Sequence, residues 1–246
     1  MSNLQAIVLG LVQGLTEFLP VSSSGHLVIA QNLIPGFSQP GILFDVILHF
    51  ATLFAVLAYF RLSILKLESR YLWYLAVGTV PAVIAGIFFK DAIEAMFLTT
   101  KFLAIQFFIS GIINFWIDAV KPGKSGVKTK NSLVTGIAQA ISIIPAISRS
   151  GATILSGVAQ KVEPKKAVEF SFLLSVPAIL GANILQIASY GTKVEVFSLN
   201  YLLGFAAAFI SGFFAIGFVF KILLNKKFKL FGYYCILLGV LTLFFN

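Results

Sequence analysis

Long apolar runs limit, more than any single motif, what this chain can fold into. Hydrophobic residues make up 59% of the 246 residues and charged residues only 11%, whereas soluble domains are close to a quarter charged. Such a chain has too little polar surface to cover a globule in water. Glycine, proline and polar residues interrupt the runs, without the period-two alternation of a transmembrane strand, which favours helices. The sequence therefore predicts an all-α polytopic membrane protein.

Six of these runs are long enough to cross the hydrocarbon core of a bilayer, which takes about 20 helical residues. They cover residues 42–60, 71–89, 102–120, 170–189, 199–220 and 230–245. Two further regions, 4–34 and 131–160, each contain two shorter apolar runs separated by a polar break with proline and glycine. A polar break at membrane depth is tolerated where protein or a water-filled cavity surrounds it. We therefore predict that both regions are re-entrant helical hairpins.

The two hairpin regions match each other at a fixed offset along the chain. The matching pairs, 126 residues apart, are Gln13 and Gln139, Thr16 and Ser142, Ser22 and Ser148, Ser24 and Ser150, Gly25 and Gly151, and Gly86 and Gly212. We predict one membrane domain, residues 1–246, built from two repeats, about 1–122 and 127–246. Each repeat is a re-entrant hairpin plus three transmembrane helices. Because three crossings are an odd number, the second repeat is inverted, and inverted repeats place sites at their interface.

Charge between the apolar runs predicts which side of the protein faces the cytoplasm. Four segments of one face are basic, with net charges of +2, +4, +1 and +4 in the order 61–70, 121–130, 161–169 and 221–229. On the other face, segments 90–101 and 190–198 have no net charge. The positive-inside rule then makes the basic face cytoplasmic and places both termini outside. The net charge of +9 thus reflects orientation signals rather than nucleic-acid binding. Counting each half-hairpin as a full span would keep the same sides.

Few ionisable side chains lie outside these segments; they are Glu17, His26, Asp45, His49, Asp118 and Arg149. A charge at bilayer depth is costly unless it is paired or hydrated, so each is a candidate functional residue. Asp118 lies beside a basic segment, which favours a structural role as a partner of the lysines there. Asp45 and His49 are four residues apart. They would add metal-binding or proton-transfer capacity, or simply hydrogen-bond to each other.

The first polar break, QGLTEFLPVSSSGH at residues 13–26, brings a carboxylate next to hydroxyl groups. Gln13 and Glu17 are four residues apart and project from one face of a helix that ends at Pro20. The next half-helix is preceded by Ser22, Ser23, Ser24 and Gly25. Hydroxyls and free backbone N–H groups at a helix N-terminus form an anion site, although capping alone explains any single serine. His26 follows, and its imidazole exchanges protons near neutral pH.

The second polar break supplies SRSG at residues 148–151, again just before a half-helix, with Thr153 one turn later. Arg149 binds two phosphate oxygens with its planar fork and keeps its charge at any physiological pH. A purely structural Arg149–Glu17 ion pair is the alternative, but it leaves the surrounding hydroxyls unexplained. Two helix N-termini, an arginine and hydroxyls would hold a diphosphate, while Glu17 would hold a divalent cation such as Mg²⁺. The sequence therefore predicts phosphate chemistry within the membrane.

These motifs resemble those of the undecaprenyl-diphosphatase family, also called bacitracin-resistance proteins. QGLTEFLPVSSSGH is similar to its E/Q-rich motif and serine loop, and PAISRSGAT (145–153) resembles its PGxSRSGxT motif, with Ala146 where glycine is usual. FDVILH (44–49), TVPAVIAG (79–86) and EFSFLLSVPAILGA (169–182) are also similar to family members. The resemblance therefore covers nearly the whole chain.

The resemblance implies hydrolysis of undecaprenyl diphosphate to the monophosphate, which recycles the lipid carrier for cell-wall and glycan synthesis. It also implies a plasma-membrane site toward the outer face that needs a divalent cation, Mg²⁺ or Ca²⁺. The family's roles carry onto Glu17 for the metal or catalysis, Ser23 as nucleophile, His26 for proton transfer and Arg149 for phosphate. Gln13 stands where many members have a second glutamate. Because glutamine cannot act as a base, a mechanism with two carboxylates is not expected here.

Transport is the competing class of function, since inverted repeats with broken helices also build carriers and channels. A lipid-head flippase or an anion transporter would need the anion site but not Ser23 or His26, so hydrolysis is favoured. Carrier-lipid flipping beside hydrolysis and a homodimer are both left open. The expected partners are a polyprenyl diphosphate and membrane lipid. The expected substrate-binding residues are Gln13, Ser22, Ser24, Gly25, Ser148, Ser150, Gly151 and Thr153.

Overall fold

The computed structural model describes residues 1–38, 43–89, 102–144, 147–190, 198–224 and 227–244, and these ranges form helices joined by turns, without a β-strand. The first half of the chain contains α1 (Asn3–Phe18), α2 (Ser23–Leu33), α3 (Leu43–Tyr59), α4 (Arg61–Ile64), α5 (Ser69–Phe88) and α7 (Leu103–Ala119). The second half contains α8 (Thr129–Ile141), α9 (Arg149–Ala159), α10 (Pro164–Tyr190), α11 (Leu199–Leu224) and α12 (Phe228–Thr242). The predicted all-α class is confirmed.

The six predicted spans all coincide with apolar helices, but these differ in length. In α5, α10 and α11, the stretches Ser69–Phe88, Pro164–Gln186 and Leu199–Ile222 are long and apolar enough to cross a membrane. The helices α3, α7 and α12 are also apolar but shorter, with 17, 17 and 15 residues. The helix α10 begins six residues before the predicted span, because Pro164 is well suited to the first helical position.

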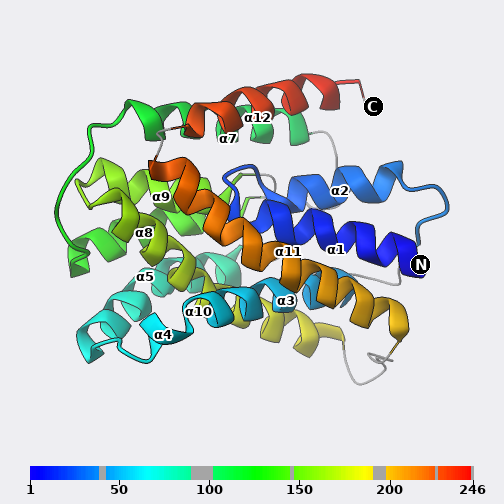
Figure 1. The fold of residues 1–246 in the computed structure, drawn as a ribbon, viewed down its shortest axis with the longest axis horizontal. Coiled ribbons are helices and arrows are strands. Elements are labelled where there is room, and N and C mark those ends of the chain that lie inside the picture. Colours follow the sequence, from blue (N-terminus) through cyan, green and yellow to red (C-terminus); the bar gives the residue numbers. More distant parts are fainter. Residues whose placement is uncertain (39–42, 90–101, 145–146, 191–197, 225–226, 245–246) are drawn as a thin grey trace.

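Both predicted hairpin regions are pairs of short helices separated by a break, as expected. The pair α1 and α2 lies toward the end of the molecule that carries both termini, whereas α8 and α9 lie toward the opposite end (Figure 1). Each second helix begins with the same cap: the hydroxyl oxygen of Ser22 accepts from the Gly25 N–H, and that of Ser148 from the Gly151 N–H. Residues 145 and 146 of the second break lie outside the described residues.

Two of the four basic segments lie at the same end of the molecule. The basic segment between α7 and α8 lies at the end opposite to the termini, and so does α4, within the basic segment 61–70 (Figure 1). The neutral segment 90–101 and most of 190–198 lie outside the described residues.

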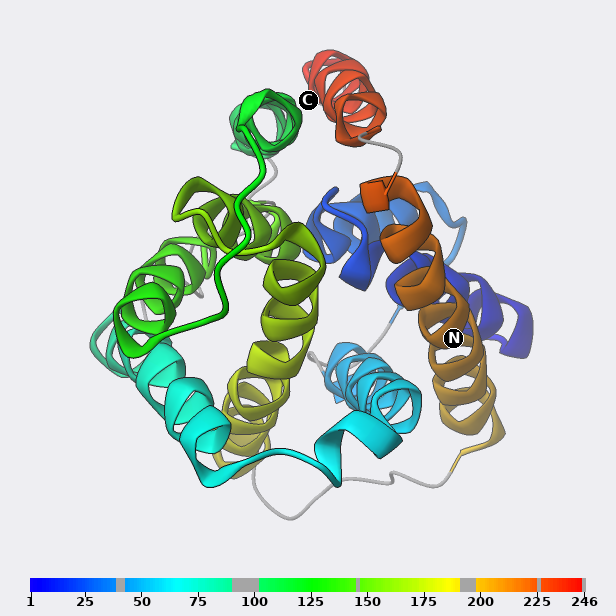
Figure 2. The ribbon, with the colours of Figure 1, turned by 60° about the vertical axis from the view of Figure 1, so that its left-hand side comes forward.

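Two close helix crossings occur at equivalent positions of the two halves. A Cβ added at Gly10 of α1 would lie 2.3 Å from the Gly204 carbonyl oxygen of α11, and one at Gly136 of α8 would lie 2.3 Å from the Gly78 carbonyl oxygen of α5. Gly10 and Gly136 are 126 residues apart, and so are Gly78 and Gly204. The two crossings lie on opposite sides of the molecule, with α3 and α10 between them (Figure 2). Glycine at these points allows backbones to touch.

The crossings predict a large effect of a single methyl group. Gly10→Ala and Gly136→Ala should each lower stability by at least about 1–3 kcal/mol, because a helix must move away to admit the Cβ. Thermal unfolding of the purified protein in detergent measures the loss. Gly86→Ala is the matched control, since its Cβ meets no described heavy atom within 4 Å. Equal melting temperatures for all three variants would contradict the crossing geometry.

Candidate active site

The two helix breaks meet in the interior of the molecule. The Ser150 hydroxyl of the second break donates to the Leu19 carbonyl of the first, at 3.1 Å. The helix α7 holds both breaks: Asn114 Nδ2 donates to the Pro20 carbonyl at 2.6 Å, and Ser110 Oγ accepts from the Ser148 N–H at 2.9 Å. Residues that are more than 90 positions apart in the chain are thereby placed around one point.

Glu17 is the centre of this arrangement. Its side chain is buried, and Oε1 accepts a 2.5 Å bond from Arg149 Nη2. Its other oxygen, Oε2, accepts from the Ser23 hydroxyl at 2.5 Å and from Gln13 Nε2 at 3.0 Å. The structure therefore brings together four predicted site residues, three from the first hairpin and one from the second.

The serines divide into capping residues and one exception. Ser22 and Ser148 cap their helices. Each also lies near the serine two positions later: the hydroxyl oxygens of Ser22 and Ser24 are 3.3 Å apart, and those of Ser148 and Ser150 are 3.2 Å apart. Ser23 is different, because its hydroxyl is directed to a carboxylate.

Thr153 and the two glycines support the second half of the site. Thr153 is fully buried, and its hydroxyl contacts the Arg149 carbonyl at 2.8 Å and the Ser171 hydroxyl at 2.6 Å. It thus joins α9 to α10 one turn after the arginine. Gly151 is packed closely, since an added Cβ would lie 3.3 Å from the Pro20 Cβ. Gly25 is buried in the first turn of α2.

His26, the residue predicted to transfer protons, is directed away from Glu17. Its Nδ1 lies 2.6 Å from the Ser22 carbonyl, and its Nε2 lies 2.8 Å from the Tyr234 hydroxyl of α12. Because a carbonyl only accepts, Nδ1 carries the proton, and Nε2 of the neutral ring accepts from the tyrosine. The imidazole also stacks on the Tyr234 ring, with centroids 5.6 Å apart. Both ring nitrogens are therefore engaged outside the Glu17 cluster.

His49 lies beside the cluster, although the sequence left its role undecided. Its Nε2 is 3.9 Å from Glu17 Oε2, and its Nδ1 donates to the Asp45 backbone carbonyl at 2.7 Å. The Asp45 carboxylate accepts from Gln31 Nε2 at 2.8 Å. The four-residue spacing of Asp45 and His49 was the available signal, but it could not show which helix His49 would face.

Asp118 has the structural role that its position predicted, with a different partner. Its carboxylate accepts a 2.8 Å bond from the Lys229 backbone N–H, which joins the end of α7 to the start of α12. A carboxylate at the first turn of a helix is favourable because of the exposed N–H groups there.

Several buried polar atoms in and near the site lack a hydrogen-bond partner among the described residues. They include Gln13 Oε1, Arg149 Nη1 and both amide atoms of Gln139. Buried polar atoms are rarely left unpaired, because the loss of water is not compensated. The arginine nitrogen suits a phosphate oxygen, and the glutamine oxygen suits a hard cation. The described residues contain no group of three His, Cys, Asp or Glu side chains able to hold a metal ion.

Comparison with known proteins identifies the family. The family described as bacitracin resistance protein BacA matches residues 6–241. The undecaprenyl-diphosphatase of Carboxydothermus hydrogenoformans is 40% identical over 254 residues, covering 99% of this chain and 97% of the relative. That of Methanobrevibacter smithii is 35% identical over 270 residues, covering 98% and 97%. Undecaprenyl-diphosphatase 3 of Bacillus cereus is 38% identical over 252 residues, covering 99% and 97%. Sequence similarity over almost the whole length shows that this chain belongs to the bacitracin resistance protein BacA family.

Proposed function

We propose that this chain is a membrane phosphatase that hydrolyses undecaprenyl diphosphate to the monophosphate and phosphate, and so recycles the lipid carrier for cell-wall and glycan synthesis. The observation that carries the proposal is the contact of Glu17 with both Ser23 and Arg149. A hydroxyl, a proton acceptor and a phosphate-binding cation are thereby gathered from two hairpins. The relatives that cover the whole chain are named undecaprenyl-diphosphatase.

Binding of the diphosphate rests on Arg149 and on two helix N-termini. Arg149 uses Nη2 for Glu17, while Nη1 is buried without a described partner. The N-termini of α2 and α9, whose backbone N–H groups favour anions, adjoin the same point. Phosphoryl transfer mainly requires positioning and charge stabilisation. Arg149 would supply the charge, and the two N-termini would position the phosphates.

The transfer step follows from the Ser23–Glu17 contact. The Ser23 oxygen forms a bond to the terminal phosphorus, and the bond from that phosphorus to the bridging oxygen breaks. The hydroxyl proton passes to Glu17, and the polyprenyl monophosphate leaves with the bridging oxygen. Water then hydrolyses the phosphoserine and releases phosphate. In an alternative mechanism, water attacks the phosphorus in place of the Ser23 oxygen, and Glu17 again accepts the proton. Substitution of Ser23 distinguishes the two mechanisms.

A divalent cation, Mg²⁺ or Ca²⁺, is proposed to bind at Glu17. The donor chemistry fits, because Gln13 Oε1 is a buried oxygen without a described partner beside a carboxylate. Hard cations of this kind take oxygen ligands and often share them with substrate phosphates. When bound, such a cation supplies charge neutralisation of the diphosphate.

The cation proposal predicts that Gln13→Glu increases metal affinity. A second carboxylate four residues from Glu17 should lower the Mg²⁺ concentration for half-maximal activity by about tenfold, because ligand charge strengthens binding of hard cations. Titration of Mn²⁺ by electron paramagnetic resonance provides a second readout that does not depend on turnover. Gln139→Glu, at the equivalent position of the second repeat, is the control. Unchanged affinity in Gln13→Glu would place the cation elsewhere.

His26 is proposed to position the serine loop rather than to carry the transferred proton. Its Nδ1–H holds the Ser22 carbonyl, and Ser22 has a positive φ of 70°, which is unfavourable for a residue other than glycine. Ser23 follows directly. We therefore expect His26→Asn, which keeps an N–H donor, to retain most of the activity.

The proton-transfer alternative for His26 makes a different prediction. If His26 were the acid or base, His26→Asn would abolish activity and remove an ionisation from the pH–rate profile. On the positioning role, His26→Ala should lose about tenfold to a hundredfold in kcat/KM, Tyr234→Phe should lose less, and none of these variants should change the shape of the profile. Measured pH–rate profiles decide between the two.

The finer topology is proposed on three features of the fold. Equivalent glycine crossings in the two halves, hairpins at opposite ends and basic segments at one end support two inverted repeats with both termini outside. The catalytic site would then open toward the outer face. Labelling of a cysteine introduced at residues 121–128 by an impermeant reagent from outside would contradict this orientation. The same symmetry permits flipping of the carrier, which stays a prediction.

One assay tests the proposed function. Purified protein in detergent is given undecaprenyl diphosphate with Mg²⁺ or with EDTA, and phosphate and lipid monophosphate are quantified together. We expect equal amounts of both products, loss of both in EDTA, and almost none with Arg149→Ala. Lipid binding without release of phosphate would contradict hydrolysis and favour the transport alternative.

A further inference from the structure

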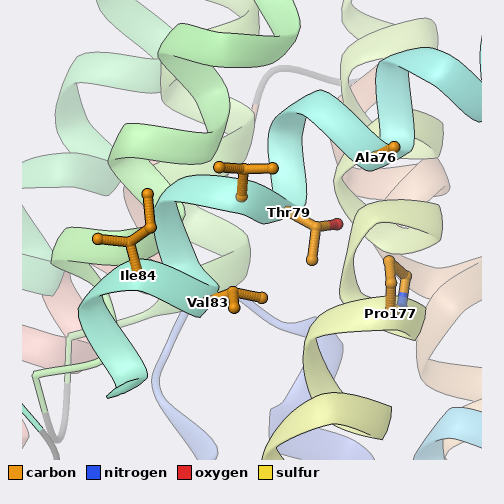
Figure 3. Close-up of a pocket in the computed structure, with 6 residues that line it drawn as sticks. Ala76, Thr79, Val83, Ile84 and Pro177 are labelled. Atoms are coloured by element: carbon orange, nitrogen blue, oxygen red, sulfur yellow. The ribbon is translucent and has the colours of Figure 1, made fainter. Parts of the chain in front are cut away.

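A shallow apolar groove lies between α5 and α10, outside the Glu17 cluster. It has a volume of about 290 Å³ and is lined by Ala76, Thr79, Val80, Val83, Ile84 and Pro177. Figure 3 shows Ala76, Thr79 and Val83 on the stretch of α5 that faces Pro177 of α10. The one polar lining side chain, Thr79, donates its hydroxyl to the Leu75 carbonyl of its own helix. The groove therefore offers an apolar surface to an occupant.

The two helices that line the groove differ in sequence from the helices 126 residues away in the other half of the chain. At an offset of 126 residues, the counterpart of Pro177 is Ala51, which is fully buried in α3, and the counterpart of Pro81 in α5 is Ala207. Proline lacks the N–H of a helical hydrogen bond and crowds the preceding turn, so it bends helices. The helices α5 and α10 thus each contain a proline where their counterparts α11 and α3 have an alanine.

Glycine contacts show the same difference directly. In the closed half, a Cβ added at Gly212 of α11 would meet Phe18 at 3.1 Å and the Cβ of Ala55 at 3.4 Å. The counterparts of Gly212 and Ala55 are Gly86 and Gly181. A Cβ added at either of these glycines meets no described heavy atom within 4 Å. Among the described residues, both helices therefore leave space for an added side chain at these glycines.

The helices that line the groove are linked to the phosphate site by contacts of α8 and α10. Ser171 of α10 contacts Thr153, one turn after Arg149, and Pro177 lies six residues further on, about 9 Å along the helix. On the other wall, Gly78 contacts Gly136 of α8, whose C-terminus leads to the second break. The groove lies on the side of Ser171 away from the basic segment 161–169.

We propose that this groove binds the isoprenyl units of the polyprenyl tail that follow the first one, while the diphosphate is held at Arg149 and Glu17. The inference rests on the proposed function, because it takes the tail from that substrate class. It assigns a role to two stretches that the phosphate site leaves unused, TVPAVIAG (79–86) and the part of EFSFLLSVPAILGA (169–182) around Pro177. Branched apolar side chains and the space beside two glycines suit a methyl-branched chain.

Substitution inside the groove tests the proposal by chain length. Val83→Trp should raise KM for undecaprenyl diphosphate about tenfold with kcat within about twofold, because apolar contact made equally in ground and transition states is lost. KM for dimethylallyl diphosphate, which has one isoprenyl unit, should not change. Gly181→Trp should have the same effect on both KM values. The protein should still fold, because a Cβ at Gly181 meets no described heavy atom within 4 Å. Val240→Trp on α12 is the control: Val240 is 42% exposed and Val83 45%.

Photolabelling supplies the second measurement. A diazirine-bearing farnesyl diphosphate should label α5 and α10, and excess undecaprenyl diphosphate, but not phospholipid, should block the labelling. Labelling displaced by phospholipid alone would show an ordinary bilayer chain in the groove and overturn the proposal, as would equal KM changes for both substrates or for the control. Failure of the wild-type protein to hydrolyse either diphosphate would instead contradict the proposed function, and the labelling would still report on the groove.

Discussion

Arg149→Lys is expected to lower kcat/KM by about 10²–10³-fold while leaving the protein folded. Lysine keeps a positive charge for the Glu17 carboxylate, which is only 8% exposed, so the fold is not left with an unpaired buried charge. It cannot bind Glu17 and a phosphate oxygen at once through a planar fork, the role proposed for Nη2 and Nη1 of Arg149. Loss of one donor to a developing anion typically has an effect of this size.

The matched control is Arg61→Lys. Arg61 is exposed and donates to the Ala58 carbonyl near the surface, so its replacement should change neither activity nor melting temperature. The measurement is kcat/KM for undecaprenyl diphosphate, with thermal unfolding of each variant in the same detergent. Activity in Arg149→Lys close to that of the wild type would show that Arg149 serves only as a structural ion pair with Glu17.

Ser23→Ala is expected to reduce kcat by about 10³–10⁶-fold if the serine is the nucleophile. The Ser23 hydroxyl lies 2.5 Å from the carboxylate that would accept its proton, and alanine removes the attacking atom without adding bulk. Rapid acid quenching with substrate labelled at the terminal phosphate should trap phosphoserine in the wild type and none in the variant. Ser175→Ala, which removes a hydroxyl bonded to the Phe172 carbonyl within α10, is the control.

A smaller loss in Ser23→Ala has a definite meaning. If activity falls by no more than about tenfold and no phosphoserine is trapped, water is the attacking group and Ser23 only orients the Glu17 carboxylate. The phosphatase function would stand in that case, and the serine route alone would be wrong.

The sequence predicted the helices and the two breaks because their signals are local. Apolar runs define the helices, and proline, serine and glycine define where they stop. The offset of 126 residues also identified which residues correspond, and Glu17, Ser23 and Arg149 do meet. Their meeting depends on the crossing of helices from two halves, which residue spacing suggests but cannot measure.

The roles of the histidines and the groove could not be obtained from local patterns. His26 is adjacent to the serines in sequence, yet in the first turn of α2 its ring contacts Tyr234, 208 residues away. His49 was ambiguous because a four-residue spacing does not say which neighbouring helix the face meets. The groove depends on Pro177 and Gly181 packing differently from Ala51 and Ala55, a contrast that appears only once the helices are placed.

The central claim is that the two helix breaks form one reaction centre, and a double-mutant cycle tests it most directly. Glu17→Gln, Arg149→Lys and the double variant are compared by kcat/KM for undecaprenyl diphosphate. Residues that act as a unit are strongly non-additive. We predict that each single substitution lowers kcat/KM by at least about a hundredfold. The kcat/KM of the double variant should be no lower than that of the less active single variant. Independent effects that multiply, or a single substitution without effect, would contradict a shared centre.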